Sequence, residues 1–234
     1  MALVDKTAWI HSVVDGRSFA DIGGLWGTVN EQVSVAHAGG ASHCAMIDIQ
    51  PAGDALWQAF DARMAELGVR DYASIEADAT LEGFEGRVGA YDVVHCSGVI
   101  YHLPDPFTLL LRLRGVTSEH LVLTSMHVPE IVENDAGRLD LSGGGAYLLH
   151  ALEGAPRAVL TRHFEQLGLN IAGLTVPLQE PLVLPNGRAA TSPWWWLMTP
   201  SLLRRMLQVA GFEVVDEGES WADRSYSFLC KARG

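Results

Sequence analysis

The chain has 234 residues, 48% of them hydrophobic, which is enough for one large domain or for a domain with a sizeable insertion. Its 16 Lys and Arg residues against 28 Asp and Glu residues give a net charge of -12, which argues against general binding to a phosphate backbone. Folding a chain of this length buries roughly 70% of the unfolded surface, so no covalent cross-links are needed.

The cysteines and the N-terminal stretch indicate in which cellular compartment the protein is expected. Cys44, Cys96 and Cys230 form no CxxC pair and lie in apolar stretches, so we expect buried free thiols in a reducing cytoplasm. The opening stretch MALVDKTAWIHSVVDG lacks the basic segment and apolar core of a signal peptide. No apolar run approaches the ~20 residues that span a bilayer. The sequence therefore predicts a soluble, cytoplasmic protein that does not bind membranes.

Helix-type and strand-type patterns alternate through the first half of the chain. The expected helices cover residues 6–14, about 30–38, 51–68 and a stretch that starts at Pro104 or Pro106. The expected strands cover residues 18–22, 43–49, 72–78, 91–99 and 120–125. Strands that are apolar throughout and separated by helices are typical of a parallel sheet covered on both faces.

The C-terminal part has a different order. Thr199 and Pro200 form a good N-cap and first turn for a helix over residues 201–210, which Gly211 ends. Two strands, 212–218 and 225–232, follow without a helix between them, so they should pair as an antiparallel hairpin. Residues 127–198 are too long for a plain connection, so we expect an inserted cap or lid within a single domain spanning residues 1–234.

The stretch FADIGGLWGTVNEQ, residues 19–32, indicates a buried strand that ends in a glycine-rich turn and leads into a helix. This arrangement favours a ligand with negative charge. In an open parallel sheet, ligands bind beyond the carboxyl ends of the strands. Asp48 ends the second strand, 21 residues after Gly27, and its carboxylate can accept hydrogen bonds from both ribose hydroxyls of an adenosine cofactor. Asp78, which ends the third strand, can meet an adenine amino group, although a strand-end aspartate is also common in turns.

The turn argues against a dinucleotide. A dinucleotide-binding turn follows the pattern GxGxxG, in which bare backbone approaches the pyrophosphate. Here Leu25 and Thr28 occupy two of the glycine positions, so a nucleotide-dependent oxidoreductase is disfavoured. A methionine carboxylate is smaller and less demanding than a pyrophosphate, which favours S-adenosylmethionine.

Several stretches resemble, in the same order, the class I S-adenosylmethionine-dependent methyltransferases. FADIGGLWG resembles the glycine-rich first motif, MIDI the acidic second motif and EADA the third. YDVVHCSGVIYHLPDP is similar to the fourth motif and its sequel, and MTPSLLRRMLQVAGFEVV to the closing helix and strand. The resemblance covers roughly residues 17–125 and 198–232. It implies a doubly wound α/β fold of the Rossmann-like methyltransferase type, with a mostly parallel seven-stranded sheet and a C-terminal antiparallel hairpin.

The resemblance also implies a cofactor site for S-adenosylmethionine, with S-adenosylhomocysteine as product. Asp21 and Gly23 would lie under the methionine end, and Ser97 would face the amino-acid portion. Trp26 and Tyr101 could supply aromatic surface near the sulfonium, or could simply be packing residues. Leu25 departs from the family's first motif, which usually has glycine there. It should narrow the approach to the methionine part, unless Gly24 supplies the flexibility instead. The full set of implied cofactor residues is Asp21, Gly23, Gly24, Trp26, Gly27, Asp48, Ile49, Asp78, Ala79, Ser97 and Tyr101.

Methyl transfer from a sulfonium is an in-line displacement, so it depends on the alignment of donor and acceptor. A hydroxyl acceptor also needs a base, usually a histidine. His127 follows the fifth strand and His102 follows the fourth, so both are candidate bases at the mouth of the site, and each could instead be a rim histidine that caps a turn. His95, within the fourth strand, is expected to be a core residue. No ligand spacing on a single element supports a metal site.

The predicted insert carries three adjacent tryptophans, Trp194, Trp195 and Trp196. Adjacent side chains on a strand point to opposite faces, so all three cannot enter one core. We expect at least one to line a substrate cleft or an interface, the alternative being that they anchor the lid to the sheet. His150 and His163 also fall in the insert and could contact substrate. The stretch LSGGGAYLL joins a glycine hinge to an apolar stretch, as a closing lid requires.

The function predicted from the sequence is methylation of a small molecule at a hydroxyl oxygen. Two alternatives stay open. One is methylation of tRNA or another RNA, which the charge of -12 and the lack of a basic stripe disfavour. The other is a protein that binds an adenosyl ligand without catalysis. The insert or the N-terminal helix could mediate a homodimer.

Overall fold

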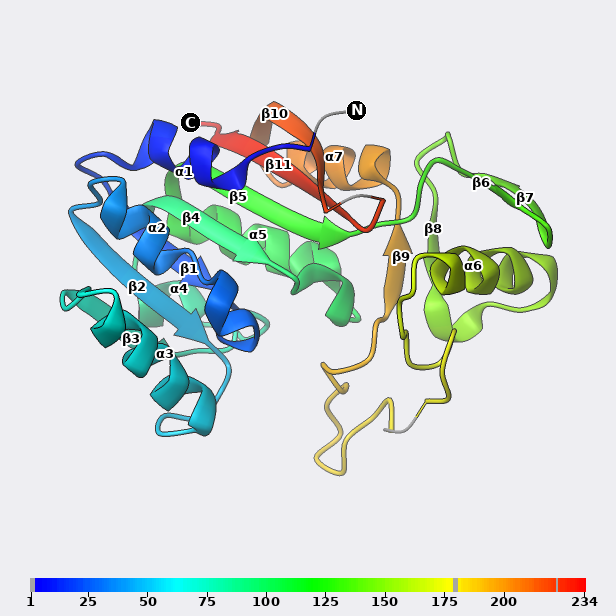
Figure 1. Cartoon of the computed structure of the whole chain (residues 1–234), viewed down its shortest axis with the longest axis horizontal. Helices are drawn as coiled ribbons and strands as arrows, with labels where there is room; N and C mark the ends of the chain where they lie inside the picture. The colour runs from blue at the N-terminus through cyan, green and yellow to red at the C-terminus, as the bar shows by residue number, and fades with distance from the viewer. Residues whose placement is uncertain (1–2, 179–180, 222) are drawn as a thin grey trace.

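The computed structural model describes residues 3–178, 181–221 and 223–234. Its central strands are β1 (Ser18–Ile22), β2 (His43–Asp48), β3 (Tyr72–Glu76), β4 (Tyr91–Ser97), β5 (Thr117–Met126), β10 (Phe212–Trp221) and β11 (Ser225–Ala232). They form a seven-stranded sheet in the order β10-β11-β5-β4-β1-β2-β3 (Figure 1). β1 to β5 run parallel, and β11 is antiparallel to both β5 and β10. The predicted sheet and its C-terminal hairpin are confirmed.

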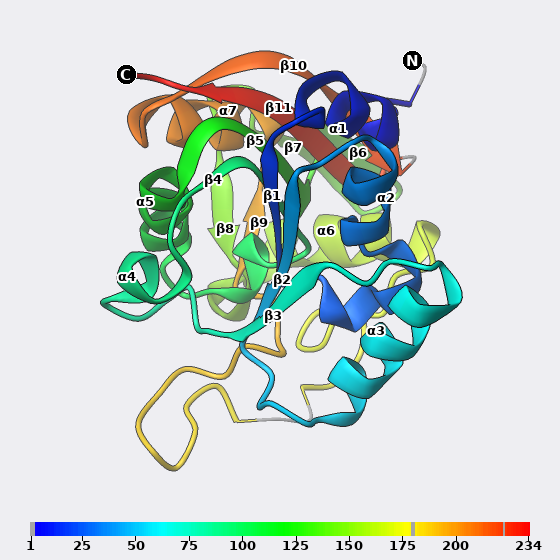
Figure 2. The same ribbon diagram turned by 90° about the vertical axis from the view of Figure 1, so that its left-hand side faces the viewer.

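Helices cover both faces of the sheet (Figure 2). One face carries α1 (Lys6–Val14), α2 (Val33–Ala38) and α3 (Ala55–Glu66), and the other carries α4 (Phe84–Val88), α5 (Pro106–Val116) and α7 (Pro200–Val209). Successive strand residues alternate between two buried clusters: Phe19 and Met46 pack under α1 to α3, whereas Ala20 and Ala45 pack under α4, α5 and α7. This alternation is what a strand buried on both faces requires.

The helix predicted to start at Pro51 begins later, at Ala55. Gly53 adopts a φ of +85°, outside the helical region, and Asp54 then caps α3 by accepting a hydrogen bond from the Leu56 backbone (2.9 Å). The buried residues of α3 are Trp57, Phe60 and Met64. The three cysteines are buried and free, as predicted.

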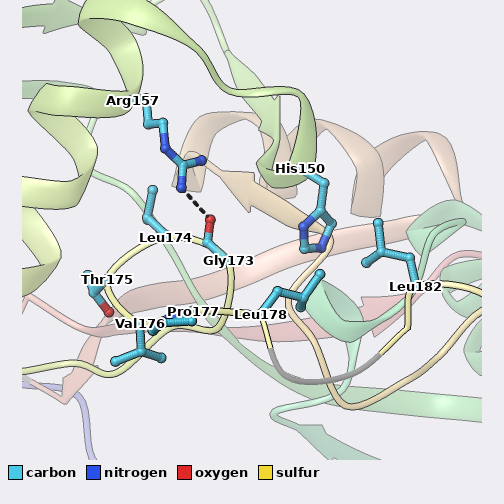
Figure 3. A pocket seen from close by; sticks show the side chains of 9 residues that line it. All are labelled: His150, Arg157, Gly173, Leu174, Thr175, Val176, Pro177, Leu178 and Leu182. Atoms are coloured by element: carbon cyan, nitrogen blue, oxygen red, sulfur yellow. Dashed lines mark hydrogen bonds between the residues drawn. The ribbon is translucent and has the colours of Figure 1, made fainter.

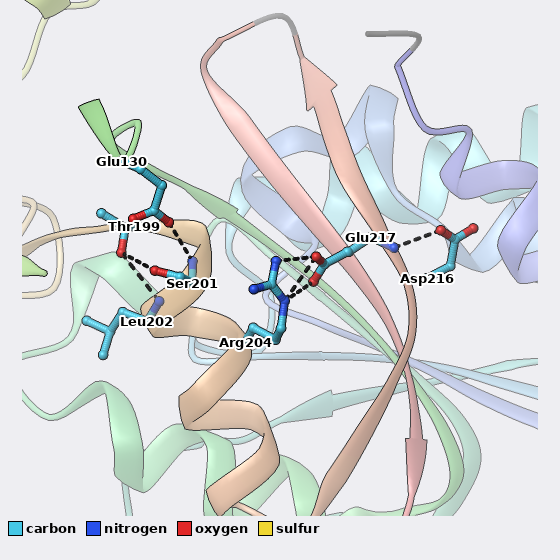
Figure 4. A network of polar contacts seen from close by, with 7 residues as sticks. All are labelled: Glu130, Thr199, Ser201, Leu202, Arg204, Asp216 and Glu217. Atoms are coloured by element: carbon cyan, nitrogen blue, oxygen red, sulfur yellow. Dashed lines mark hydrogen bonds and ion pairs between the residues drawn. The ribbon is translucent and has the colours of Figure 1, made fainter. Parts of the chain in front are cut away.

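Side-chain contacts hold the N-terminal half of the last helix, α7, in place (Figure 4). Thr199 caps α7 by accepting a hydrogen bond from the Leu202 backbone (3.3 Å), as the sequence predicted. Glu130 accepts a second hydrogen bond from the backbone of the first turn (2.9 Å). Arg204 forms an ion pair with Glu217 on β10, with Nε 2.8 Å from Oε2. α7 is therefore tied both to the hairpin and to the segment that follows β5.

Residues 127–198, called the insert below, extend beyond the carboxyl end of the parallel strands (Figure 1). The insert contains β6 (Ile131–Asn134), β7 (Gly137–Asp140), β8 (Ala146–Leu148), the 3-10 turn η3 (Leu149–Ala151), α6 (Gly154–Gln166) and β9 (Trp196–Met198). It has a buried cluster of its own, which includes Leu149, Leu160 and Phe164. In the described part of the chain, no helix is both long and apolar enough to cross a bilayer.

Candidate functional site

The strand order reverses between β1 and β4, since β1 lies between β2 and β4 in the sheet. Ligands of open α/β sheets bind outside the carboxyl ends of the strands at such a point. Asp21 lies near the end of β1, Asp48 is the last residue of β2, and Ser97 is the last residue of β4. Asp78 follows two residues after β3. The structure therefore brings residues from four neighbouring strand ends to one edge of the sheet.

Asp21 is buried and holds the glycine-rich turn in place. Its Oδ2 accepts a hydrogen bond from the Gln32 backbone (2.8 Å), which fixes the entry to α2. Its Oδ1 lies 2.7 Å from Nδ1 of His95, a buried residue of β4. Asp21 and His95 are register partners on adjacent strands. From the sequence we expected His95 to be a core residue only. Its contact with Asp21 follows from the pairing of β1 with β4, which the sequence does not specify.

Two glycines of the turn are required by close packing. Gly23 has a φ of +79°, and a Cβ at this position would lie 2.4 Å from Cγ2 of Val99. A Cβ on Gly24 would lie 2.5 Å from Oδ2 of Asp21. Gly27 has no such constraint, because its closest atom would be 3.8 Å away. The Leu25 side chain is fully buried in the cluster beneath α1 to α3, which gives a physical reason for leucine where the methyltransferase motif has glycine.

Asp48 is 3% exposed, and backbone amides hold its carboxylate. Oδ1 accepts from the Gln50 N–H at 3.0 Å, and Oδ2 accepts a long hydrogen bond from the Leu25 N–H at 3.3 Å. Burial raises the pKa of Asp48, and the backbone hydrogen bonds offset only part of that rise. The neighbouring Ile49 is exposed. Oδ2 accepts the longer of the two hydrogen bonds, so it can exchange the Leu25 N–H for a hydroxyl group of a bound diol.

Asp78 is contacted by the insert. Its Oδ1 accepts hydrogen bonds from the Thr80 N–H (2.9 Å) and Oγ1 (2.6 Å), and its Oδ2 is paired with the Arg188 guanidinium. Burial raises the pKa of the Asp78 carboxyl, but the bonds from Thr80 and Arg188 outweigh it and hold that pKa below its ordinary value. The adjacent Ala79 packs against the buried cluster beneath α4, α5 and α7. The position expected to face adenine therefore already has a cationic partner.

The two aromatic residues expected near the sulfonium lie in different surroundings. Trp26 is 78% exposed. Tyr101 belongs to the 3-10 turn η2 (Ile100–His102) and is buried, with its ring centroid 4.6 Å from that of Trp194. Burial raises the pKa of the Tyr101 hydroxyl to about 12.

The two candidate bases have different surroundings. His102 lies at the end of η2, where its Nδ1 donates a hydrogen bond to the Pro193 carbonyl of the insert (3.1 Å). His127 is 3% exposed, and neither of its ring nitrogens has a hydrogen-bond partner among the described residues. The His127 ring packs edge-on against Tyr226, with centroids 5.7 Å apart. Burial lowers the pKa of both histidines. Only His102 is therefore fixed in one orientation by a polar contact.

The adjacent tryptophans attach the insert to the segment after β4. The Trp195 N–H donates to the Tyr101 carbonyl (2.8 Å), and the Trp196 indole N–H donates to the Pro104 carbonyl (3.1 Å). Trp196 packs against the buried cluster beneath α4, α5 and α7, and Trp194 packs against both that cluster and the insert's own cluster. The Trp195 ring instead lies edge-on to His150, with centroids 5.5 Å apart. The side chains alternate in direction, as expected for extended backbone.

The two histidines of the insert, His150 and His163, have different surroundings. His150 lines a cavity of about 570 Å³ within the insert, together with Arg157 and the loop that follows α6 (Figure 3). His163 lies on α6 with its ring against Phe164, with centroids 5.0 Å apart. Across the residues that the structure describes, no three His, Cys, Asp or Glu side chains gather in a way that could hold a metal ion.

Comparison with known proteins gives likeness in structure but not in sequence. No protein-family model and no curated protein matches the chain. Magnesium protoporphyrin IX methyltransferase from Synechocystis PCC 6803, crystallised with bound S-adenosylhomocysteine, superimposes with a TM-score of 0.58 at 17% identity, over 98% of this chain and 80% of that one. An S-adenosylmethionine-dependent methyltransferase from Mesorhizobium loti gives 0.57 at 13% identity, over 97% and 95% of the two chains.

A third similar structure performs different chemistry. The [4+2]-cyclase SpnF gives a TM-score of 0.54 at 12% identity, over 97% of this chain and 80% of that one. At such identities the likeness concerns the fold, and one fold can host several reactions. The chain has the Rossmann-like fold of the class I S-adenosylmethionine-dependent methyltransferases, as its sequence motifs predicted.

Proposed function

We propose that this chain transfers a methyl group from S-adenosylmethionine to a hydroxyl oxygen of a small molecule. The observation that carries the proposal is the row of acidic side chains at the ends of β1, β2 and β3, namely Asp21, Asp48 and Asp78, beside the point where the strand order reverses. Carboxylates in this row can accept hydrogen bonds from the ribose and the adenine of the cofactor, and Asp21 lies at the end expected to hold its methionine part. The fold is shared with proteins crystallised with the product of that cofactor.

The residues of the edge fit the parts of the cofactor. Asp48 holds the ribose hydroxyls, for which its Oδ2 exchanges the long bond to the Leu25 N–H. Asp78 and Ala79 face the adenine, and Ser97, at the end of β4, faces the amino-acid portion. S-adenosylmethionine supplies a methyl group activated by a positive sulfur. The contribution of the chain is alignment, which can account for roughly 7–11 kcal/mol of a barrier.

His102 is the better of the two candidate bases. Its Nδ1 donates to the Pro193 carbonyl, so in the neutral ring Nε2 is the acceptor nitrogen. Burial lowers the pKa of His102, which keeps the ring neutral at physiological pH. A neutral ring with a fixed acceptor nitrogen can remove a hydroxyl proton as the new bond forms. We assign His127 to packing against Tyr226.

The acceptor is proposed to be a small molecule because the chain carries a net charge of -12 and the insert is rich in aromatic side chains near η2. Methylation of RNA is the less favoured alternative, since phosphate binding requires clustered basic residues. The insert is proposed to cover the acceptor as a lid, and any homodimer would use the insert or α1.

The test is calorimetric titration with S-adenosylhomocysteine of the wild type and of Asp48→Asn. The amide keeps the shape of the carboxylate but removes its charge, and hydrogen bonds to a charged group contribute roughly 1.5–3 kcal/mol. We therefore expect the affinity to fall about 10- to 100-fold. Asp71→Asn, an exposed carboxylate just before β3 at the opposite edge of the sheet, is the matched control and should bind like the wild type. Failure of the wild type to bind at millimolar ligand would refute the proposal.

A second candidate function is binding of an adenosyl ligand without methyl transfer. It is favoured by the contacts that already engage two of the acids: the Leu25 N–H on Asp48 and Arg188 on Asp78. The cyclase with the same fold illustrates that the fold does not dictate the reaction. Firm binding of S-adenosylhomocysteine with no consumption of S-adenosylmethionine, over a panel of hydroxylated small molecules, would select this candidate.

A further inference from the structure

The insert contains a cavity for which the proposed cofactor site has no use. Its volume of about 570 Å³ falls within the range of roughly 300–1,000 Å³ that is typical of sites for small molecules. The walls come from η3, from α6 and from the loop after α6 (Figure 3). The described lining residues all belong to the insert, and none of them is one of the acids at the strand ends.

The walls combine apolar surface with one cation. Leu174, Val176 and Leu178 supply hydrocarbon surface, and Arg157 enters from α6. The Arg157 Nη2 donates to the Gly173 carbonyl (2.7 Å), which fixes the guanidinium against the loop and engages one of its five N–H groups. Among the lining residues that the structure describes, none is an aspartate or a glutamate. An arginine that has no carboxylate partner among the described residues, in a cavity with both polar and apolar walls, favours an anion.

His150 supplies a second polar atom in the cavity wall. Its Nε2 is buried and has no hydrogen-bond partner within the described part of the chain. Burial lowers the pKa of His150; a hydrogen bond to the Trp194 backbone opposes this in part, and the nearby charge of Arg157 adds to the lowering. The lowered pKa favours the neutral ring, which leaves Arg157 as the cation of the wall. A buried polar atom without a partner is costly, and a bound ligand or water removes that cost.

The cavity is coupled to the mouth of the proposed site through two residues. The His150 ring lies edge-on to Trp195, and the Trp195 N–H donates to the Tyr101 carbonyl. Tyr101 directly precedes His102 in η2. A molecule that extends from the cavity toward η2 would therefore approach the candidate base.

We propose that the insert cavity binds the carboxylate end of an apolar organic acid, with Arg157 as the anion partner and Leu174, Val176 and Leu178 as the apolar wall. That this acid is the methyl acceptor rests on the proposed function, whereas binding of the carboxylate does not. The acceptor class that follows is a hydroxylated apolar carboxylic acid.

The test compares 2-naphthoate with the neutral 2-naphthamide, which has nearly the same shape, by calorimetric titration. In the wild type we expect naphthoate to bind at least about tenfold more tightly, since charge-assisted hydrogen bonds are about twice as strong as neutral ones. In Arg157→Gln this preference should be lost, while the amide can still donate to the Gly173 carbonyl. Arg162→Gln is the matched control, because Arg162 lies on the same helix but pairs with Asp135 on the exposed surface. It should keep the preference.

A measurement on the wild type alone provides a second readout. The ring nitrogens of His150 should shift in nuclear magnetic resonance spectra on addition of naphthoate and much less on addition of naphthamide. Equal affinity for the two compounds, no binding of either at millimolar concentration, or a preference that survives in Arg157→Gln would overturn the proposal. Titration of the same samples with S-adenosylhomocysteine separates the two hypotheses, because Arg157→Gln should leave that affinity unchanged.

Discussion

The ion pair between Arg188 and Asp78 predicts that the insert competes with the cofactor. Asp78 is the acid expected to accept a hydrogen bond from adenine, and the Arg188 guanidinium contacts the Asp78 Oδ2. Thr80 already donates twice to Oδ1. An adenine amino group must therefore share Oδ2 with Arg188 or displace it. We expect Arg188→Gln to bind S-adenosylhomocysteine more tightly than the wild type.

The magnitude follows from the exposure of the pair. The Arg188 side chain is 47% exposed and that of Asp78 is 9% exposed, so solvent screens the pair in part. Pairs of this kind contribute about 0.5–1 kcal/mol, which corresponds to a gain in affinity of roughly 2- to 5-fold. High salt weakens the same ion pair, so added salt should raise the affinity of the wild type more than that of Arg188→Gln.

Calorimetric titration at low and high salt checks both expectations. Arg138→Gln is the control, because Arg138 also lies in the insert but pairs with Glu133 at the exposed surface. It should behave like the wild type at both salt concentrations. Weaker binding by Arg188→Gln would mean that Arg188 supports the cofactor instead of competing with it, and unchanged binding would mean that the pair opens at no cost; either result refutes the reasoning.

The remaining predictions concern histidines and one helix cap. His102→Gln should lower turnover without weakening S-adenosylhomocysteine binding, and because burial lowers the pKa of His102, wild-type turnover should persist below pH 6.5 before it falls. Five histidines have lowered pKa values in the folded chain, and the three most buried of them are His102, His127 and His163. Below pH 6.5 the unfolded chain therefore binds more protons than the folded one, so the urea midpoint should fall as the pH is lowered. Each of these three histidines contributes up to ~1.4 kcal/mol per pH unit. A constant midpoint from pH 7.5 to 5.5 would contradict this. Thr199→Ala should cost about 1 kcal/mol of unfolding free energy in the same assay, with Thr199→Ser close to the wild type.

The seven-stranded sheet was predictable because local signals agree with the tertiary arrangement. The predicted strand at 18–22 matches β1, and the predicted hairpin partner at 225–232 matches β11. Both are apolar runs bounded by turn or polar residues. Asp48 and Asp78 could be placed at strand ends for the same reason, since an apolar strand ends where the chain turns polar.

The parts that sequence reasoning missed depend on contacts between distant residues. The strands of the insert have three or four residues, and β8 pairs with β9 across the whole of α6. Such short strands carry no periodic signal of their own. The Asp21–His95 pair likewise follows from strand register, and the Arg188–Asp78 pair from how the insert docks on the sheet. Neither can be read from spacing along the chain.

The segment 188–196 links three features that would act in one reaction. Arg188 contacts the adenine-side acid, the Pro193 carbonyl orients His102, and Trp195 lies against His150 at the cavity. Only the first contact is a partly exposed ion pair. The others are a hydrogen bond and a ring contact among partly buried groups, and Trp195 adds a backbone hydrogen bond to Tyr101. If adenine displaces Arg188, the segment should therefore open at that end while the base and the cavity keep their positions, and Arg188→Gln should bind 2-naphthoate as the wild type does.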